Sequence, residues 1–181
     1  MNFDDRAQIF RRIIRDRLAE QENGFVQFFR LLAATPVPEG TARIVIAIYE
    51  DDLTEKFPAL LAYVSGNNQS VANDEAARRL HARLSSFQPV IDIQQLAELS
   101  DWEMHGDEQV PALRQPYDHV DYVGELVIPA LCDAAAKADM SALSVPVHLG
   151  SAQRYEDVKV IYEPSAPPEP GFWSRVLRKG Q

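Results

Sequence analysis

The sequence has few of the residues that covalent cross-links, phosphate loops and membrane spans require. Its one cysteine, Cys132, excludes an internal disulfide and is typical of a reducing compartment. Only eight residues are glycine, and no P-loop or dinucleotide-binding glycine motif is present, which argues against glycine-cradled nucleotide binding. No apolar run approaches the roughly 20 residues of a membrane span. The first residues lack the basic and apolar segments of a secretory signal, so we expect a cytoplasmic protein.

Basic residues are scarce relative to acidic ones. The 181 residues include 18 Lys and Arg against 27 Asp and Glu, which gives a formal net charge of −9. This balance argues against a nucleic-acid partner and against broad adhesion to an anionic membrane. The composition is otherwise that of a folded protein, with 46% hydrophobic and 25% charged residues. A chain of this length buries enough apolar surface to fold without a metal or a disulfide.

Apolar residues that recur every three or four positions predict helices over much of the chain. The first helical stretch is expected to break at Asn23-Gly24. Pro129 is expected to kink the last helix or to start a new one. A short helix follows Asp92, whose side chain can cap it. The longer helices are predicted over residues 3–34, 53–64, 73–86 and 119–138.

Strands are predicted where β-branched apolar residues gather in short runs. Residues 43–49 form a nearly continuous apolar run, which predicts a central strand covered on both faces. Two later apolar runs, residues 145–149 and 157–162, predict a hairpin with Pro146 on an edge strand. We therefore predict one α+β domain over residues 1–163, with a sheet of three to four strands and helices packed on it. The further strands are predicted over residues 89–93, 145–149 and 157–162, and residues 101–117 are expected to be irregular.

Cationic side chains gather on the first predicted helix. Arg11, Arg12 and Arg15 fall largely on the face opposite its apolar stripe. Such a cluster can hold phosphate or an acidic partner, but the acidity of the chain offers partners within the same molecule. We expect these arginines to pair with the protein's own carboxylates or to stay solvated.

Residues 164–181 form a proline-rich tail that ends in a short amphipathic segment. Four prolines predict a stiff, extended spacer. The last residues then place two aromatic and two aliphatic side chains on one helical face, with cations on the rest. This segment can dock on its own domain, grip a groove of a partner, or touch a membrane weakly. The residues of the apolar face are Phe172, Trp173, Val176 and Leu177.

The acidic residues concentrate in the segment from Glu98 to Glu125. It holds eight acids and one base, Arg114, for a net charge of −7. The segment is either a solvated face that keeps the protein soluble or a docking surface for a basic protein. Aromatic residues interleave with the acids, as in binding hot spots, although they equally suit a core beneath a loop. For partner binding we select Trp102, Glu103, Asp107, Glu108 and Asp121.

Histidine and carboxylate side chains in the same segment offer an alternative chemistry. His105, Asp107, His119 and Asp121 have the atom types that bind a divalent metal, although their spacing matches no established metal motif. No Gly-x-Ser-x-Gly elbow supports a serine hydrolase. Cys132 has no histidine near it in sequence, which favours a structural thiol. We expect no cofactor.

Three functional hypotheses follow from these features. The first is a non-enzymatic binding protein, such as an immunity or inhibitor protein, that covers a basic toxin or enzyme with its acidic segment. The second is a metal-assisted hydrolase that uses the histidine and aspartate cluster. The third is a structural or scaffolding subunit tethered by its tail. The sequence favours the first and leaves the oligomeric state and the partner's identity open.

Overall fold

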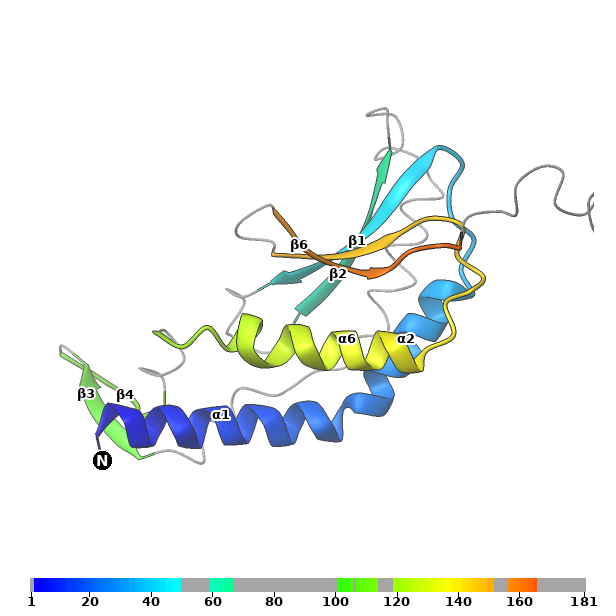
Figure 1. Ribbon diagram of the computed structural model, residues 1–181. Coiled ribbons are helices and arrows are strands. Elements are labelled where there is room, and N and C mark those ends of the chain that lie inside the picture. Colours follow the sequence, from blue (N-terminus) through cyan, green and yellow to red (C-terminus); the bar gives the residue numbers. More distant parts are fainter. Residues whose placement is uncertain are drawn as a thin grey trace, which may run out of the picture.

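Figure 1 shows the computed structural model, which describes residues 2–49, 59–66, 101–105, 107–113, 119–151 and 156–165. Four strands form a mixed sheet in the order β2-β1-β5-β6, and two more form a separate antiparallel pair, β3-β4. In this view the helices α1, α2 and α6 lie on one side of the four-stranded sheet. The predicted α+β class, with helices on a small sheet, is confirmed.

Helices α1 (Phe3–Glu20) and α2 (Glu22–Ala33) follow one another with a break at Gln21. The Asn2 side chain caps α1 by accepting a 2.8 Å hydrogen bond from the Asp5 N–H. The predicted break at Asn23-Gly24 is wrong by two residues, since both residues lie inside α2. A glycine inside a helix costs about 1 kcal/mol relative to alanine. The burial of the α2 phenylalanines, at about 1.5–3 kcal/mol each, exceeds that cost. The buried phenylalanines of α2 are Phe25, Phe28 and Phe29.

Strand β1 (Thr41–Tyr49) is the central strand predicted from its continuous apolar run, because β2 and β5 flank it. Gly40 precedes it with φ of 80°, a conformation that favours glycine, and the Thr41 N–H closes this turn on the Pro38 carbonyl. Alternate side chains of β1 point to the helices and are completely buried; these are Ile44, Ile46 and Ile48. The opposite face is also covered at Ala47, which is buried.

Strand β2 (Ala59–Gly66) corrects the helix predicted over residues 53–64. The apolar spacing of this stretch fits a helix, but Leu60, Ala62 and Val64 also alternate with period two. That alternation places them opposite the buried isoleucines of β1, in an antiparallel ladder that runs the length of both strands. Pairing with β1 therefore decides the structure, which local spacing cannot reveal. Residues 53–58 of the predicted helix lie outside the described residues.

Strands β5 (Val147–Ser151) and β6 (Glu156–Tyr162) form the predicted antiparallel hairpin. The edge position expected for Pro146 is wrong, because β5 lies between β1 and β6. Pro146 immediately precedes β5, where its missing N–H breaks no ladder bond. Its carbonyl accepts a 2.9 Å hydrogen bond from the Ile44 N–H and so begins the parallel β1–β5 pairing.

The helix predicted over residues 119–138 consists of a short π-helix, η2 (Val123–Val127), and α6 (Ile128–Lys137). Pro129 lies in the first turn of α6, which confirms the predicted fresh start. Leu131 and Ala134 of α6 are completely buried in the core. Cys132 is half-buried and packs against that core.

Strands β3 (Trp102–His105) and β4 (Glu108–Pro111) form a hairpin where the sequence predicted irregular structure. The register pairs Trp102 with Pro111 and His105 with Glu108, and the sequence between the two strands reads Gly106-Asp107. A Gly-Asp pair between two short strands is a recognised hairpin signal. The sequence contains this signal. Pro111, at the last strand position, disfavours a strand and led to the prediction of irregular structure.

Several predicted elements fall outside the described residues. They are the helix over residues 73–86, the strand over 89–93, the helix after Asp92, and residues 166–181 of the tail. The single-domain boundary at residue 163 likewise stays a prediction. Among the helices of the described ranges, none combines the length and the apolar character needed to cross a membrane.

Candidate interaction surface

The β3–β4 hairpin has two faces with different environments. Glu103 points towards α1, where its carboxylate forms an ion pair with Arg6, and both side chains are largely buried. Trp102 and Met104, at the alternate positions of β3, point the other way and are 57% and 65% exposed. One face of the hairpin is therefore anchored on the protein, and the other presents two large apolar side chains to solvent.

The base of the hairpin is attached to the folded core. The Ala112 N–H donates a 2.6 Å hydrogen bond to the Asp101 carbonyl, which closes the two strands at their open end. Ala112 and Leu113 follow β4 and are buried, and Leu113 belongs to the main hydrophobic core. The exposed tryptophan thus sits on a hairpin that is fixed at its base and on one face.

Three exposed carboxylates belong to the hairpin or adjoin it. Asp101 immediately precedes Trp102, Asp107 lies in the turn, and Glu108 begins β4. Glu108 pairs with His105, so its side chain lies on the same face as Glu103 rather than beside Trp102. The hairpin as a whole thus combines exposed apolar and acidic side chains, the composition described for binding hot spots. A protein surface rich in Lys and Arg complements it, because opposite charges steer the encounter and the apolar centre is buried on contact.

Some of the acidic residues already have partners within the molecule. Besides the Arg6–Glu103 pair, the Arg11 side chain donates to Glu125 at 2.8 Å. This hydrogen bond lowers the pKa of Glu125 and raises the pKa of Arg11. The expectation that arginines of the first helix pair with the protein's own carboxylates is confirmed for Arg6 and Arg11. Asp101, Asp107 and Glu108 of the hairpin segment remain exposed to a partner.

The five residues selected for partner binding do not all lie together. Trp102, Glu103, Asp107 and Glu108 belong to the hairpin, but Glu103 and, by the strand register, Glu108 are on its anchored face, with Glu108 exposed to solvent. Asp121 is exposed at the start of the η2–α6 segment, where its Oδ1 accepts a 3.0 Å hydrogen bond from the Gly124 N–H. Asp121 thus has a structural role as a helix cap. Met104, which the sequence analysis did not select, shares the exposed face with Trp102.

The residues of the metal hypothesis have other contacts. The His119 ring lies 6.4 Å from the Phe3 ring, and Asp121 caps the helical segment. Asp107 is exposed in the hairpin turn, and the His105 side chain lies outside the described set. Within the part of the chain that the structure describes, no three His, Cys, Asp or Glu side chains gather in a way that suits a metal ion. The metal-assisted hydrolase therefore stays a sequence prediction.

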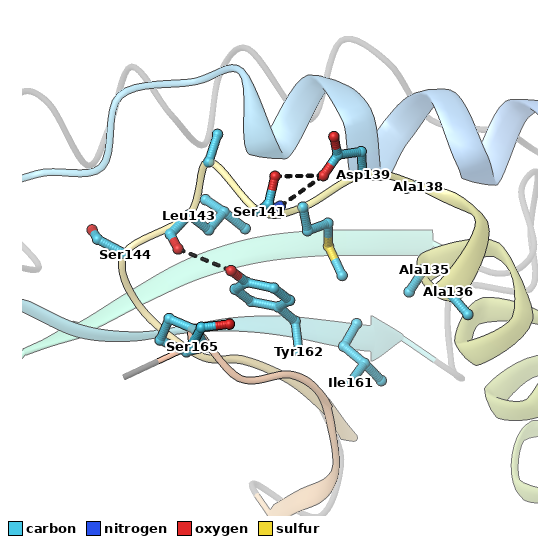
Figure 2. Close-up of a pocket in the computed structure, with 13 residues that line it drawn as sticks. Ala135, Ala136, Ala138, Asp139, Ser141, Leu143, Ser144, Ile161, Tyr162 and Ser165 are labelled. Carbon is cyan, nitrogen blue, oxygen red and sulfur yellow. Dashed lines mark hydrogen bonds between the residues drawn. The ribbon is translucent and has the colours of Figure 1, made fainter. Parts of the chain in front are cut away.

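A groove of about 820 Å³ lies at the other end of α6 (Figure 2). Its wall is formed by the end of α6, the loop that follows it, the end of β6 and the residues just after β6. Tyr162 crosses the groove, and its hydroxyl donates a 3.1 Å hydrogen bond to the Leu143 carbonyl. The apolar lining includes Ala138, Met140, Leu143 and Ile161.

The polar groups at the rim of the groove hold the loop in shape. Asp139 Oδ1 accepts hydrogen bonds from the Ser141 N–H at 3.0 Å and from its hydroxyl at 2.6 Å, as Figure 2 shows. These two bonds lower the pKa of Asp139. Among the described residues of the lining there is no histidine or lysine to act as a base for the serine hydroxyls.

Comparison with models of protein families, with curated proteins and with solved structures gives no match to this chain.

Proposed function

We propose that this chain is a non-enzymatic binding protein whose β3–β4 hairpin docks on a basic surface of another protein. The observation that carries the proposal is the exposure of Trp102 and Met104 on a hairpin that is otherwise fixed to the fold. Tryptophan is enriched among the residues that dominate binding energy, and methionine adapts to irregular apolar surfaces. Burying both against a partner removes from water the apolar area that folding leaves exposed.

The exposed carboxylates of the hairpin support a basic partner rather than a neutral one. Asp101, Asp107 and Glu108 contribute three negative charges to the hairpin and its base. Charges at the rim of an interface mainly accelerate association, and their effect weakens as salt screens them. The apolar centre mainly sets how slowly the complex dissociates. The two parts of the surface are therefore expected to control different rate constants.

Inhibition by occlusion is the activity that this surface suits best. A protein that covers the active site of a basic toxin or enzyme needs shape, charge and an apolar anchor, but no catalytic group of its own. Immunity proteins and enzyme inhibitors act in this way. This function agrees with a negatively charged chain, and we propose that it is exercised in the cytoplasm.

The experiment compares hairpin variants with a matched control after the partner has been captured from the source cells at low salt. Trp102→Ala is expected to weaken affinity about 30-fold, mostly through faster dissociation. Asp107→Lys with Glu108→Lys is expected to slow association about tenfold or more at low salt and less at high salt. The control is Asp16→Lys with Glu39→Lys, which reverses two exposed acids of α1 and of the turn before β1.

The outcomes separate the proposal from nonspecific acidity. Normal binding by the control variant, loss of binding by the hairpin variants, and loss of the partner's own activity in the complex support it. If all three variants bind equally well, the hairpin is not the docking surface. If the control weakens binding as much as the hairpin variants do, the net charge rather than the hairpin attracts the partner.

A further inference from the structure

The groove beside α6 is continuous with the start of the C-terminal tail. Pro164 and Ser165 are themselves part of its lining, and sixteen residues follow Ser165 in the sequence. Six of these separate Ser165 from Phe172. Because an extended residue spans at most about 3.6 Å, those six reach about 20 Å from the wall of the groove. The apolar residues of the tail are therefore tethered within reach of the groove.

The chemistry of the tail matches the chemistry of the groove. The tail carries Phe172, Trp173, Val176 and Leu177 at spacings that share one helical face. The groove offers alanine, methionine, leucine and isoleucine side chains in a volume that accommodates bulky apolar groups. Packing of an amphipathic helix into an apolar groove is a common mode of peptide recognition.

The charges match as well. Asp139 is exposed on the groove, and its lowered pKa keeps it ionised. Glu163 is exposed immediately before the groove-lining Pro164. The tail carries Arg175, Arg178 and Lys179 around its apolar residues. The chain thus combines a cationic apolar segment in its tail with an apolar groove that has an acidic rim.

From these matches we propose that residues 172–179 dock into this groove of their own chain. A tether of six residues gives the tail a millimolar effective concentration at the groove, which an untethered competitor has to exceed. The tail covers the apolar wall formed by α6, the following loop and β6. This docking is separate from the hairpin surface and does not depend on the proposed function.

Tryptophan fluorescence tests the proposal in the full-length chain. The sequence has two tryptophans, so Trp102→Phe leaves Trp173 as the single reporter on the tail. In this background a blue-shifted emission and weak quenching by acrylamide are expected. Adding Ala136→Arg, at an exposed position of α6 that lines the groove, is expected to shift the emission towards that of a solvated tryptophan. Quenching is then expected to rise severalfold.

Two further variants distinguish loss of docking from misfolding. Ala142→Arg places the same cation on the loop side of the groove, also at an exposed position, and is expected to act like Ala136→Arg. Ala19→Arg makes the same change at an exposed position of α1 outside the groove and is expected to leave Trp173 buried. Circular dichroism and cooperative unfolding check that each variant is folded.

The outcomes are decisive in each direction. Burial of Trp173 that both groove variants remove and Ala19→Arg preserves supports the docking. A solvated Trp173 in the Trp102→Phe chain overturns it, and so does burial that neither groove variant changes. Burial that depends on protein concentration, together with a dimer in sedimentation, also overturns it, because the groove is then occupied by a second copy.

Discussion

In both the central sheet and the β3–β4 hairpin, alternate side chains of a strand point to the same face. The two regions differ in whether that face is buried or exposed. In β1, the alternate residues Ile44, Ile46 and Ile48 are completely buried against the helices. In β3, the alternate residues Trp102 and Met104 are more than half exposed. Large apolar side chains on one face of a strand are thus part of the core in one region and available to a partner in the other.

The two regions are also held together by different forces. The sheet is stabilised by backbone ladders on both sides of β1 and by an apolar core that includes residues of α1, α2 and α6. The hairpin is fixed to α1 by the ion pair between Arg6 and Glu103 and by its buried base. We therefore expect substitutions in the core to affect global stability, and substitutions on the hairpin to affect its position or its binding.

The largest expected effect is that of Phe10→Ala, which tests the core side of this comparison. The Phe10 ring is buried and makes an edge-to-face contact with Tyr122 at 5.8 Å. Its removal is expected to lower the free energy of unfolding by about 3–5 kcal/mol, through lost apolar burial and a cavity. Trp102→Ala removes an even larger ring but is expected to change the free energy of unfolding by about 0.5 kcal/mol or less.

Urea unfolding of both variants measures the difference. A loss for Trp102→Ala as large as that for Phe10→Ala would show that the tryptophan is packed in solution and is not a free anchor for a partner.

An intermediate effect is expected for Glu103→Gln, which tests the attachment of the hairpin. The variant keeps the shape of the side chain but removes the charge that pairs with the largely buried Arg6. Loss of this charge-assisted interaction is expected to lower the free energy of unfolding by about 1–3 kcal/mol. Hydrogen exchange of the amides in β3 and β4 is expected to accelerate more than exchange in β1.

The matched control is Glu108→Gln, which neutralises an exposed carboxylate of the same hairpin. It is expected to leave amide exchange unchanged. Equal acceleration by the two variants would mean that the charge of the hairpin, rather than the Arg6–Glu103 contact, determines its stability.

The smallest effect is expected for Glu125→Gln, and it depends on pH. The hydrogen bond from Arg11 lowers the pKa of Glu125 below its ordinary value of 4.5. The ion pair therefore stabilises the fold above pH 4.5, and its contribution is lost as the pH falls through the lowered native pKa. Thermal unfolding of both proteins is expected to show a slightly higher Tm for the original chain at pH 7 and no difference at acidic pH.

Added salt is expected to reduce the small difference at pH 7, because Glu125 is exposed and Arg11 is only half-buried. A difference that persists at acidic pH would assign the effect of Glu125→Gln to something other than charge.

Sequence patterns predict an element best when its structure depends on its own residues and not on its pairing partner. The run at residues 43–49 is apolar on both faces, so it predicts a central strand wherever its neighbours come from. Leu60, Ala62 and Val64 fit two periodicities, and only the buried isoleucines of β1 select the strand. The order β2-β1-β5-β6 also depends on pairing between distant segments, which local spacing does not contain.

The candidate surface was predictable in composition but not in geometry. The acidic excess and Trp102 identify from the sequence alone the segment that we propose as the docking surface. The assignment of Glu103 to the anchored face needs the position of Arg6, which is distant in the sequence. Met104 joins the surface only because the hairpin places it on the same side as Trp102. The groove combines residues from α6, the following loop and β6, so no single sequence motif predicts it.

The parallel pairing of β1 with β5 also has a consequence for synthesis on the ribosome. Ile44 pairs with Val147, and more than half of the chain is translated between them. This strongly apolar strand therefore leaves the ribosome long before one of its two neighbours exists. Until β5 emerges, one edge of β1 is open to other chains, a situation that favours aggregation and chaperone binding. The nascent protein thus passes through a long interval in which its future core depends on protection by other molecules.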